Sequence, residues 1–225
     1  MRLADPGETA LDIGANIGYM SLVLARAVGP RGRVVSFEPC PSVLPILRMN
    51  VDSWVSLQFA PIEIRAIALS DRDGEGQLGL PADSDQNWGL ASLEVAEGGI
   101  PIQLQRLDSL ESHGAGIMKV DVEGHEAAVF EGAQNLLAHK LIRDILFEEH
   151  QPYPARSHKI LLEHGYRIFR LTRSTGRPLL LPADQLARQA YLPSNYIATA
   201  DPARAENRFR ASGWYALSNG LHHNR

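Results

Sequence analysis

The chain has 225 residues, of which 44% are hydrophobic and 21% charged, a composition typical of a globular protein that buries a substantial core. The formal net charge of −4, from 22 basic and 26 acidic residues, gives no broad attraction toward nucleic acid or an anionic membrane. The start lacks a signal-peptide pattern, no apolar run reaches the roughly 18–20 residues of a membrane helix, and the single cysteine, Cys40, cannot form an intramolecular disulfide, so we expect a cytoplasmic protein.

Apolar segments that end in turn residues alternate with helical patterns at the start of the chain. Residues 9–13 form a short apolar run that predicts a buried strand, and residues 19–28 carry large apolar side chains at helical spacing. The Gly-Pro-Arg-Gly sequence at 29–32 ends this helix, and residues 33–37 predict a second buried strand. These segments form one strand-helix-strand unit.

The same alternation continues, less sharply, to residue 200. Helices are expected at 41–51, at 108–113, at 126–139 and from Pro154 to Leu162, strands at 62–69, 117–121, 142–148, 166–172, 179–181 and 195–199, and a hairpin and loop at 76–104. Buried strands that alternate with helices predict a doubly wound α/β fold, with a mainly parallel sheet covered on both faces.

A glycine-rich loop lies where the first strand should lead into the first helix. It reads Asp12-Ile-Gly14-Ala-Asn16-Ile-Gly18, and Glu38 follows at the end of the second strand. Such a loop binds a nucleoside ligand in this type of fold, and a carboxylate at the next strand end can accept both ribose hydroxyls. The alternative is that the glycines only form a turn and that Glu38 is a solvated charge.

Two ligands fit this loop and acid. A dinucleotide needs amide groups around its pyrophosphate, usually in a G-x-G-x-x-G turn, whereas S-adenosylmethionine has no phosphate. The spacing here is G-x-N-x-G, and the carboxylate of Asp12 attracts a cationic amino and sulfonium ligand but repels a pyrophosphate. These features favour S-adenosylmethionine.

Several motifs resemble those of FkbM-type methyltransferases. They are Leu-Asp-Ile-Gly-Ala-Asn-Ile-Gly-Tyr at 11–19, Val-Ser-Phe-Glu-Pro at 35–39 and Met-Lys-Val-Asp-Val-Glu-Gly-His-Glu at 118–126, with weaker agreement at 68–71, 87–92, 132–133 and 146–150. The resemblance runs from about residue 9 to about residue 170. It implies a class I methyltransferase fold with a C-terminal antiparallel hairpin, S-adenosylmethionine as the donor, and O-methylation of a sugar, polyketide or other small metabolite.

The same resemblance assigns roles to the cofactor residues. Asp12, Gly14, Asn16 and Gly18 would hold the methionine part, and Glu38 would bind the ribose. The end of the third strand, from Ala68 to Asp71, would contact the adenine. Enzymes of this kind commonly carry more residues before the first strand, which here begins near Thr9, so we expect a short N-terminal cover.

Polar residues at the ends of two later strands are candidates for the chemistry. Transfer to a hydroxyl needs a proton acceptor, and ligands in open α/β sheets bind at the carboxyl ends of strands. We expect the catalytic group among Asp121, Glu123 and His125. These are preferred to the group at the end of the next strand, which comprises Glu148, Glu149 and His150.

The same residues also allow other interpretations of the site and of the function. The acidic residues near 121–126 would also suit the first turn of a helix, and the combined set could bind a divalent cation. The protein could instead be a dinucleotide-dependent oxidoreductase or a non-catalytic partner module. We expect one domain over residues 1–200 and a solvated tail over 201–225, which contains Arg204, Arg208 and Arg210.

Overall fold

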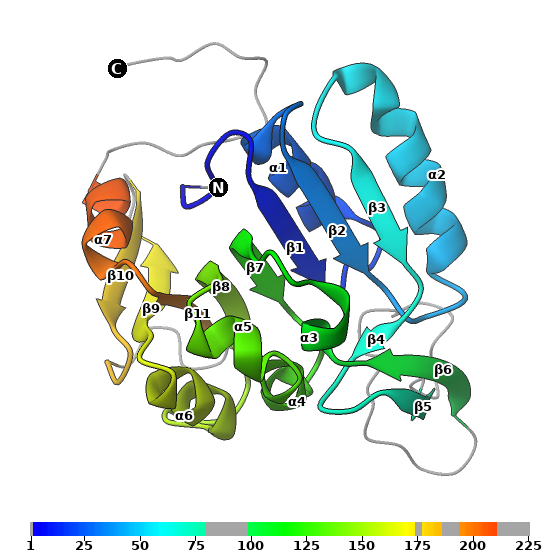
Figure 1. The fold of residues 1–225 in the computed structure, drawn as a ribbon. Helices are drawn as coiled ribbons and strands as arrows, with labels where there is room; N and C mark the ends of the chain where they lie inside the picture. The colour runs from blue at the N-terminus through cyan, green and yellow to red at the C-terminus, as the bar shows by residue number, and fades with distance from the viewer. Residues whose placement is uncertain (1, 80–98, 174–176, 186–193, 211–225) are drawn as a thin grey trace.

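The computed structural model describes residues 2–79, 99–173, 177–185 and 194–210 (Figure 1). Its main sheet has eight strands in the order β10-β9-β11-β8-β7-β1-β2-β3. The strands are β1 (Thr9–Ile13), β2 (Arg33–Phe37), β3 (Ile62–Arg65), β7 (Ala115–Val120), β8 (Ile142–Glu149), β9 (Arg167–Arg173), β10 (Pro178–Pro182) and β11 (Ser194–Thr199). The sequence motif at 87–92, which includes Trp88, lies outside the described residues.

The five strands from β8 to β3 are parallel, and β1 lies at their centre between β7 and β2. Side chains alternate along β1, so that Leu11 and Ile13 join one hydrophobic core while Ala10 joins another on the opposite face. A strand buried on both faces needs apolar residues at nearly every position. The prediction of a doubly wound, mainly parallel α/β sheet is confirmed.

Helices cover both faces of this sheet. Leu24 of α1 (Tyr19–Val28) and Phe209 of α7 (Pro202–Arg210) pack with Ala10. Leu11 packs on the other face with α4 (Glu126–Glu131), α5 (Gln134–Ala138) and α6 (Arg156–Glu163), which lie in front of the sheet in Figure 1. Beside β3 lies α2 (Leu44–Trp54), which leads into a 3-10 turn, η1 (Val55–Leu57). Within the described ranges, no helix combines the length and apolar character needed to cross a membrane.

The helix expected at 126–139 is two helices, α4 and α5. Its backbone turns at Gly132, where a Cβ atom would lie only 1.9 Å from the carbonyl oxygen of Ser70. The short helix expected at 108–113 is confined to α3 (Leu107–Leu110), whose Asp108 carboxylate accepts hydrogen bonds from the first amides of α5 at 2.8 and 3.1 Å. Contacts to other elements therefore set both helix boundaries.

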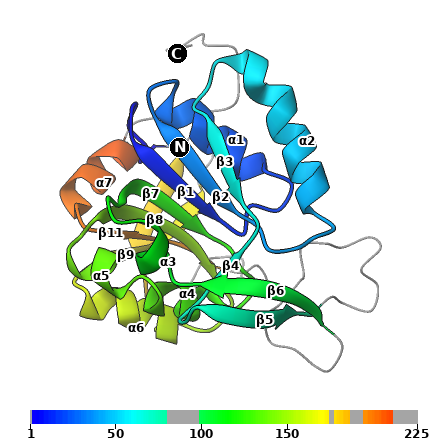
Figure 2. The ribbon, with the colours of Figure 1, turned by 45° about the vertical axis from the view of Figure 1, so that its right-hand side comes forward.

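The strand expected at 62–69 is divided between two sheets. Its first part is β3, and its second part, β4 (Ala68–Leu69), belongs to a small sheet of order β4-β6-β5. The hairpin expected at 76–104 supplies the other strands, β5 (Gly74–Leu78) and β6 (Ile100–Gln105), which pair antiparallel. Figure 2 shows this small sheet next to the ends of β2 and β3.

The C-terminal strands close the other edge of the main sheet. The expected antiparallel hairpin consists of β9 and β10, and β11 inserts antiparallel between β8 and β9. The expectation of a solvated tail is wrong for residues 202–210, because they form α7 and bury Ala205 and Phe209. The packed structure therefore extends past residue 200.

Charged contacts fix α7 to the N-terminal segment. Arg204 donates to Asp144 at 2.8 Å, to Asp5 at 2.5 Å and to the carbonyl of Leu3 at 2.7 Å. Arg208 also pairs with Asp5. Asp144 is fully buried in β8, so its charge needs these partners. Arg204 and Arg208, which we expected in a solvated tail, therefore stabilise the fold. Arg210 is different, because its side chain is 74% exposed.

We predict that Arg204→Met lowers the free energy of unfolding by about 2–3 kcal/mol, because charged hydrogen bonds to buried groups are lost. Arg210→Met on the same helix is the matched control and should change it by less than about 0.5 kcal/mol. Urea denaturation of both variants measures the difference. Equal stability of the two variants would contradict a structural role for Arg204.

Candidate functional site

A pocket opens at the carboxyl ends of β1, β2 and β7. Beyond β1 the chain first adds β2 and β3 on one side, and it later returns with β7 on the other side. Ligands in open α/β sheets bind at such a change of direction. The pocket is lined by Ile13, Gly14, Asn16, Phe37, Glu38, Pro39, Ile67, Ala68, Leu69, Leu78, Asp121, Val122 and Glu123.

The loop between β1 and α1 forms one wall of the pocket. Gly14 has φ +73°, and a Cβ atom there would lie 2.0 Å from the carbonyl oxygen of Asp121. Only glycine therefore allows the loop to approach the end of β7 this closely. The amides of Gly14 and Ala15 donate to the carbonyl of Phe37 at 3.0 and 2.9 Å, which ties the loop to β2.

Glu38 links this loop to the end of β2 and also lines the pocket. One carboxylate oxygen accepts the amide of Asn16 at 2.8 Å, and the other accepts the amide of Cys40 at 2.9 Å. Burial raises the pKa of Glu38, and these two amides partly offset that rise. The residue has two functions at once, because its carboxylate both shapes the loop and faces the pocket.

Asp12 lies beneath the loop and not on the pocket wall. It is fully buried, and Ser21 of α1 donates to its carboxylate at 2.5 Å. In the sheet Asp12 pairs with Lys119, whose ammonium group lies 3.3 Å from the Asp12 carboxylate. Lys119 also donates to the carbonyl of Gly14 at 2.6 Å. Asp12 therefore supports the loop from below, and the expectation that it contacts the ligand directly does not fit this position.

Gly18 likewise lies outside the pocket lining. It precedes α1 with φ +91°, and a Cβ atom there would lie 2.6 Å from Leu47 of α2. The glycine therefore lets α1 begin close to α2. Gly18 thus belongs to the loop as expected, but its neighbour is Leu47 of α2 and not the pocket where the donor was expected.

The pocket's apolar side comes from the small sheet and the segment before it. Ile67, Ala68, Leu69 and Leu78 line this side, so Ala68 lies where the sequence placed it. Asp71 does not line the pocket, and its carboxylate instead pairs with Arg72 at 3.1 Å. The segment therefore offers apolar contact and not a carboxylate.

Asp121 and Glu123 reach the pocket from the turn after β7. Glu123 has φ +50°, which is uncommon for a residue other than glycine. The buried carboxylate of Glu126 holds this turn, because it accepts the amides of Val122 at 3.2 Å and Gly124 at 3.3 Å. The catalytic assignments of Asp121 and Glu123 are therefore compatible with the geometry.

His125 is directed elsewhere. Its Nε2 atom lies 3.0 Å from the hydroxyl oxygen of Ser70, and the residue is absent from the pocket lining. Ser70 follows β4, so this contact joins the start of α4 to the small sheet. The imidazole of His125 thus contacts the small sheet and not the pocket, which argues against the expected role of His125 as the proton acceptor.

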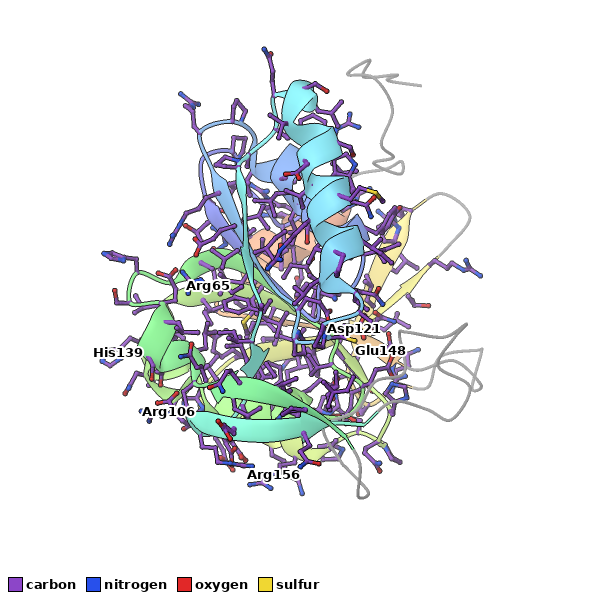
Figure 3. All side chains as sticks on the ribbon, turned by 90° about the vertical axis from the view of Figure 1, so that its right-hand side faces the viewer. Arg65, Arg106, Asp121, His139, Glu148 and Arg156 are labelled. Atoms are coloured by element: carbon purple, nitrogen blue, oxygen red, sulfur yellow. The ribbon has the colours of Figure 1, made fainter. Side chains whose placement is uncertain are left out.

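A second histidine lies beside Glu123. The Nε2 atom of His150 is 3.6 Å from Glu123 and 3.8 Å from Glu148. Burial raises the pKa of Glu123 and of Glu148, and the negative charge of Asp121 raises both further. The charges of Asp121 and Glu123 act on Glu148, so the ends of β7 and β8 form one acidic region, in which Figure 3 labels Asp121 and Glu148. Across the described ranges, no cluster of three or more histidine, cysteine or carboxylate side chains has the arrangement of a metal site.

Sequence reasoning missed two contributors. Lys119 lies within the motif at 118–126, but the motif alone does not reveal its contact with Asp12. The signal is the spacing of two residues from Ile117, which places Lys119 on the same face of the sheet as Asp12 and α1. Leu78 joins the pocket only through the small sheet, and no local pattern signals that contact.

Comparison with known proteins agrees with this geometry. Residues 12–168 match the family model described as the methyltransferase FkbM domain. The crystal structure of methyltransferase FkbM from Methylobacillus flagellatus KT superposes with a TM-score of 0.56 at 16% identity, over 88% of this chain and 44% of the other. At this identity the superposition shows a shared fold.

Two curated proteins share shorter segments. A protein-L-isoaspartate O-methyltransferase of Aeropyrum pernix is 45% identical over 76 residues, which are 34% of this chain and 26% of the other protein. The AMB antimetabolite synthetase AmbE of Pseudomonas aeruginosa is 41% identical over 71 residues, 31% of this chain and 3% of that protein. The chain thus spans a small part of these relatives.

We predict that Lys119→Met lowers the free energy of unfolding by about 3–5 kcal/mol, because it leaves the Asp12 carboxylate buried without a cation. The double variant Asp12→Asn/Lys119→Met should recover part of this loss, since no buried charge remains. Chemical denaturation measures the free energy of unfolding of the single and the double variant, and Lys159→Met on the exposed face of α6 is the control. A double variant less stable than Lys119→Met would show that the two residues do not act as a pair.

Proposed function

The chain belongs to the FkbM methyltransferase family, whose methyl donor is S-adenosylmethionine, and from this premise we propose that it transfers the methyl group to a hydroxyl of a sugar, polyketide or other small metabolite. The observation that carries the proposal is the position of Asp121 and Glu123 on the wall of the same pocket that Glu38 lines. A proton acceptor and a donor-binding carboxylate thus share one cavity.

The pocket residues fit the donor. The absence of a side chain at Gly14 lets the loop lie against the end of β7, so that Gly14 and Asn16 line the pocket, and Glu38 presents a carboxylate suited to the two ribose hydroxyls. Ala68 and its apolar neighbours suit the adenine. Gly14, Asn16, Glu38 and Ala68 therefore bind the donor, Asp12 and Gly18 support the loop from outside the pocket, and Asp71 takes no part in donor binding.

The bound donor supplies an electrophilic methyl group, and this chain's residues must align the acceptor and remove its proton. Glu123 is well suited because burial and the charge of Asp121 raise its pKa, which makes its carboxylate a stronger base. The negative charge of these residues would repel a carboxylate acceptor, so we favour a hydroxyl.

Cys40 is a buried free thiol, which agrees with our proposal of a cytoplasmic location.

Release of S-adenosylhomocysteine tests this function directly. The purified protein is incubated with S-adenosylmethionine and with separate pools of sugars, polyketides and hydroxylated metabolites, and the methylated product is identified by mass spectrometry. Product in any pool supports the proposal. Donor binding without product in every pool would instead indicate a non-catalytic module, and binding of a nicotinamide dinucleotide alone would indicate an oxidoreductase.

We predict that Glu38→Gln weakens S-adenosylmethionine binding by roughly 1.5–3 kcal/mol, the value of hydrogen bonds to a charged group. Isothermal titration calorimetry measures the affinity, and circular dichroism checks the fold, because Glu38 also bonds Asn16 and Cys40. Glu63→Gln at an exposed position of β3 is the control. Unchanged affinity in a folded Glu38→Gln protein would exclude the ribose role.

The proton acceptor has its own test. Of the variants Asp121→Asn and Glu123→Gln, the one that lacks the base should lose on the order of 10²–10⁴-fold in turnover with the acceptor found above, while it still binds the donor. His125→Gln should lose far less, because its imidazole contacts Ser70. The assignment fails if both carboxylate variants turn over normally.

A further inference from the structure

Two carboxylates line the pocket at the end of β7, and a third lies near them at the end of β8. We call Asp121, Glu123 and Glu148 the acidic rim. Asp121 and Glu123 line the pocket itself, and Glu148 joins them through His150, whose Nε2 atom lies within 4.0 Å of both glutamates. The side chains are 43%, 31% and 26% exposed, so water screens their charges only in part.

Among the residues that the structure describes, the positive charges near the rim do not balance it. Lys119 lies 3.7 Å from Asp121, but its side chain is only 8% exposed, and its ammonium group also serves Asp12 and the carbonyl of Gly14. His150 carries charge only when protonated. Burial is the main cause of the raised pKa values of Glu123 and Glu148, and repulsion by Asp121 raises both further.

The fold holds this repulsive arrangement in place. Glu123 adopts a left-handed backbone conformation, and Glu126 fixes the turn around it through two amides. Glu148 is held by β8, which pairs with β7 on one side and β11 on the other. The fold therefore holds Asp121 and Glu123 on the pocket wall with Glu148 beside them, so a donor that enters the pocket meets negative charge as long as these carboxylates are ionised.

The donor and the by-product of methyl transfer differ in charge at the reacting atom. When the methyl carbon bonds to the acceptor oxygen, the electron pair of the broken carbon–sulfur bond stays on sulfur, and the hydroxyl proton passes to a base. The sulfonium becomes a neutral thioether. We propose that the acidic rim makes the pocket select the cationic donor over neutral S-adenosylhomocysteine, so that the loss of charge on transfer favours release of the by-product.

This inference rests on the use of S-adenosylmethionine at this pocket, and its test needs no methyl acceptor. Calorimetry gives the ratio of the dissociation constants of S-adenosylhomocysteine and S-adenosylmethionine. Each of Asp121→Asn, Glu123→Gln and Glu148→Gln should lower this ratio by about 1.5- to 5-fold, the effect of one partly exposed charge pair, and Glu123→Gln/Glu148→Gln should lower it further. Glu163→Gln, at an exposed position of α6, is the matched control and should leave the ratio unchanged.

A third probe separates charge from shape. S-adenosylhomocysteine sulfoxide is neutral but carries on sulfur a substituent close in size to the methyl group. If charge decides, the sulfoxide, whose oxygen carries partial negative charge, binds no more tightly than S-adenosylhomocysteine, whereas binding as tight as that of the donor would show selection by shape and overturn the inference. A ratio that no rim substitution changes would overturn it too. Failure of the wild-type protein to bind either the donor or the by-product would instead refute the donor site on which the proposed function depends.

Discussion

The buried ion pair between Asp12 and Lys119 is the constraint on which the pocket depends. The two residues face each other across β1 and β7, next to the point where the chain changes direction in the sheet. Lys119 also binds the carbonyl of Gly14, so one ammonium group joins the strand, the loop and the neighbouring strand. A charge pair at this depth is favourable only with good geometry and further hydrogen bonds, and Ser21 supplies one of them. The glycine loop thus sits on a fixed polar base.

The sequence predicted most of the main sheet because its strands are strongly apolar and its helices are periodic. The position of the pocket followed from the same pattern, since parallel strands bring their carboxyl ends to one edge. Gly14, Asn16, Glu38, Asp121 and Glu123 therefore line the pocket at the edge that this pattern predicts, and Ala68, which the family resemblance suggested, lines it too. Asp12 was misplaced because its charge suggested a ligand, although the alternation along β1 puts it on the face of α1 with Ala10.

The features that sequence reasoning misjudged depend on contacts between distant parts of the chain. Residues 62–69 form one apolar pattern, but pairing with β6 draws Ala68 and Leu69 into the small sheet. His125 has the chemistry of a base, but Ser70, 55 positions away, engages its imidazole. The polar sequence of α7 resembles a solvated tail, but Arg204 pairs with the buried Asp144 and with Asp5, and Arg208 also pairs with Asp5. Local patterns contain no information about such partners.

The left-handed conformation of Glu123 has an evolutionary consequence. A residue with a side chain in this region loses roughly 1–3 kcal/mol relative to a relaxed backbone, whereas glycine adopts it freely. Selection for stability alone would therefore drive position 123 toward glycine and remove a carboxylate from the pocket wall. Folding stability and the charge of the pocket wall therefore make opposite demands on position 123.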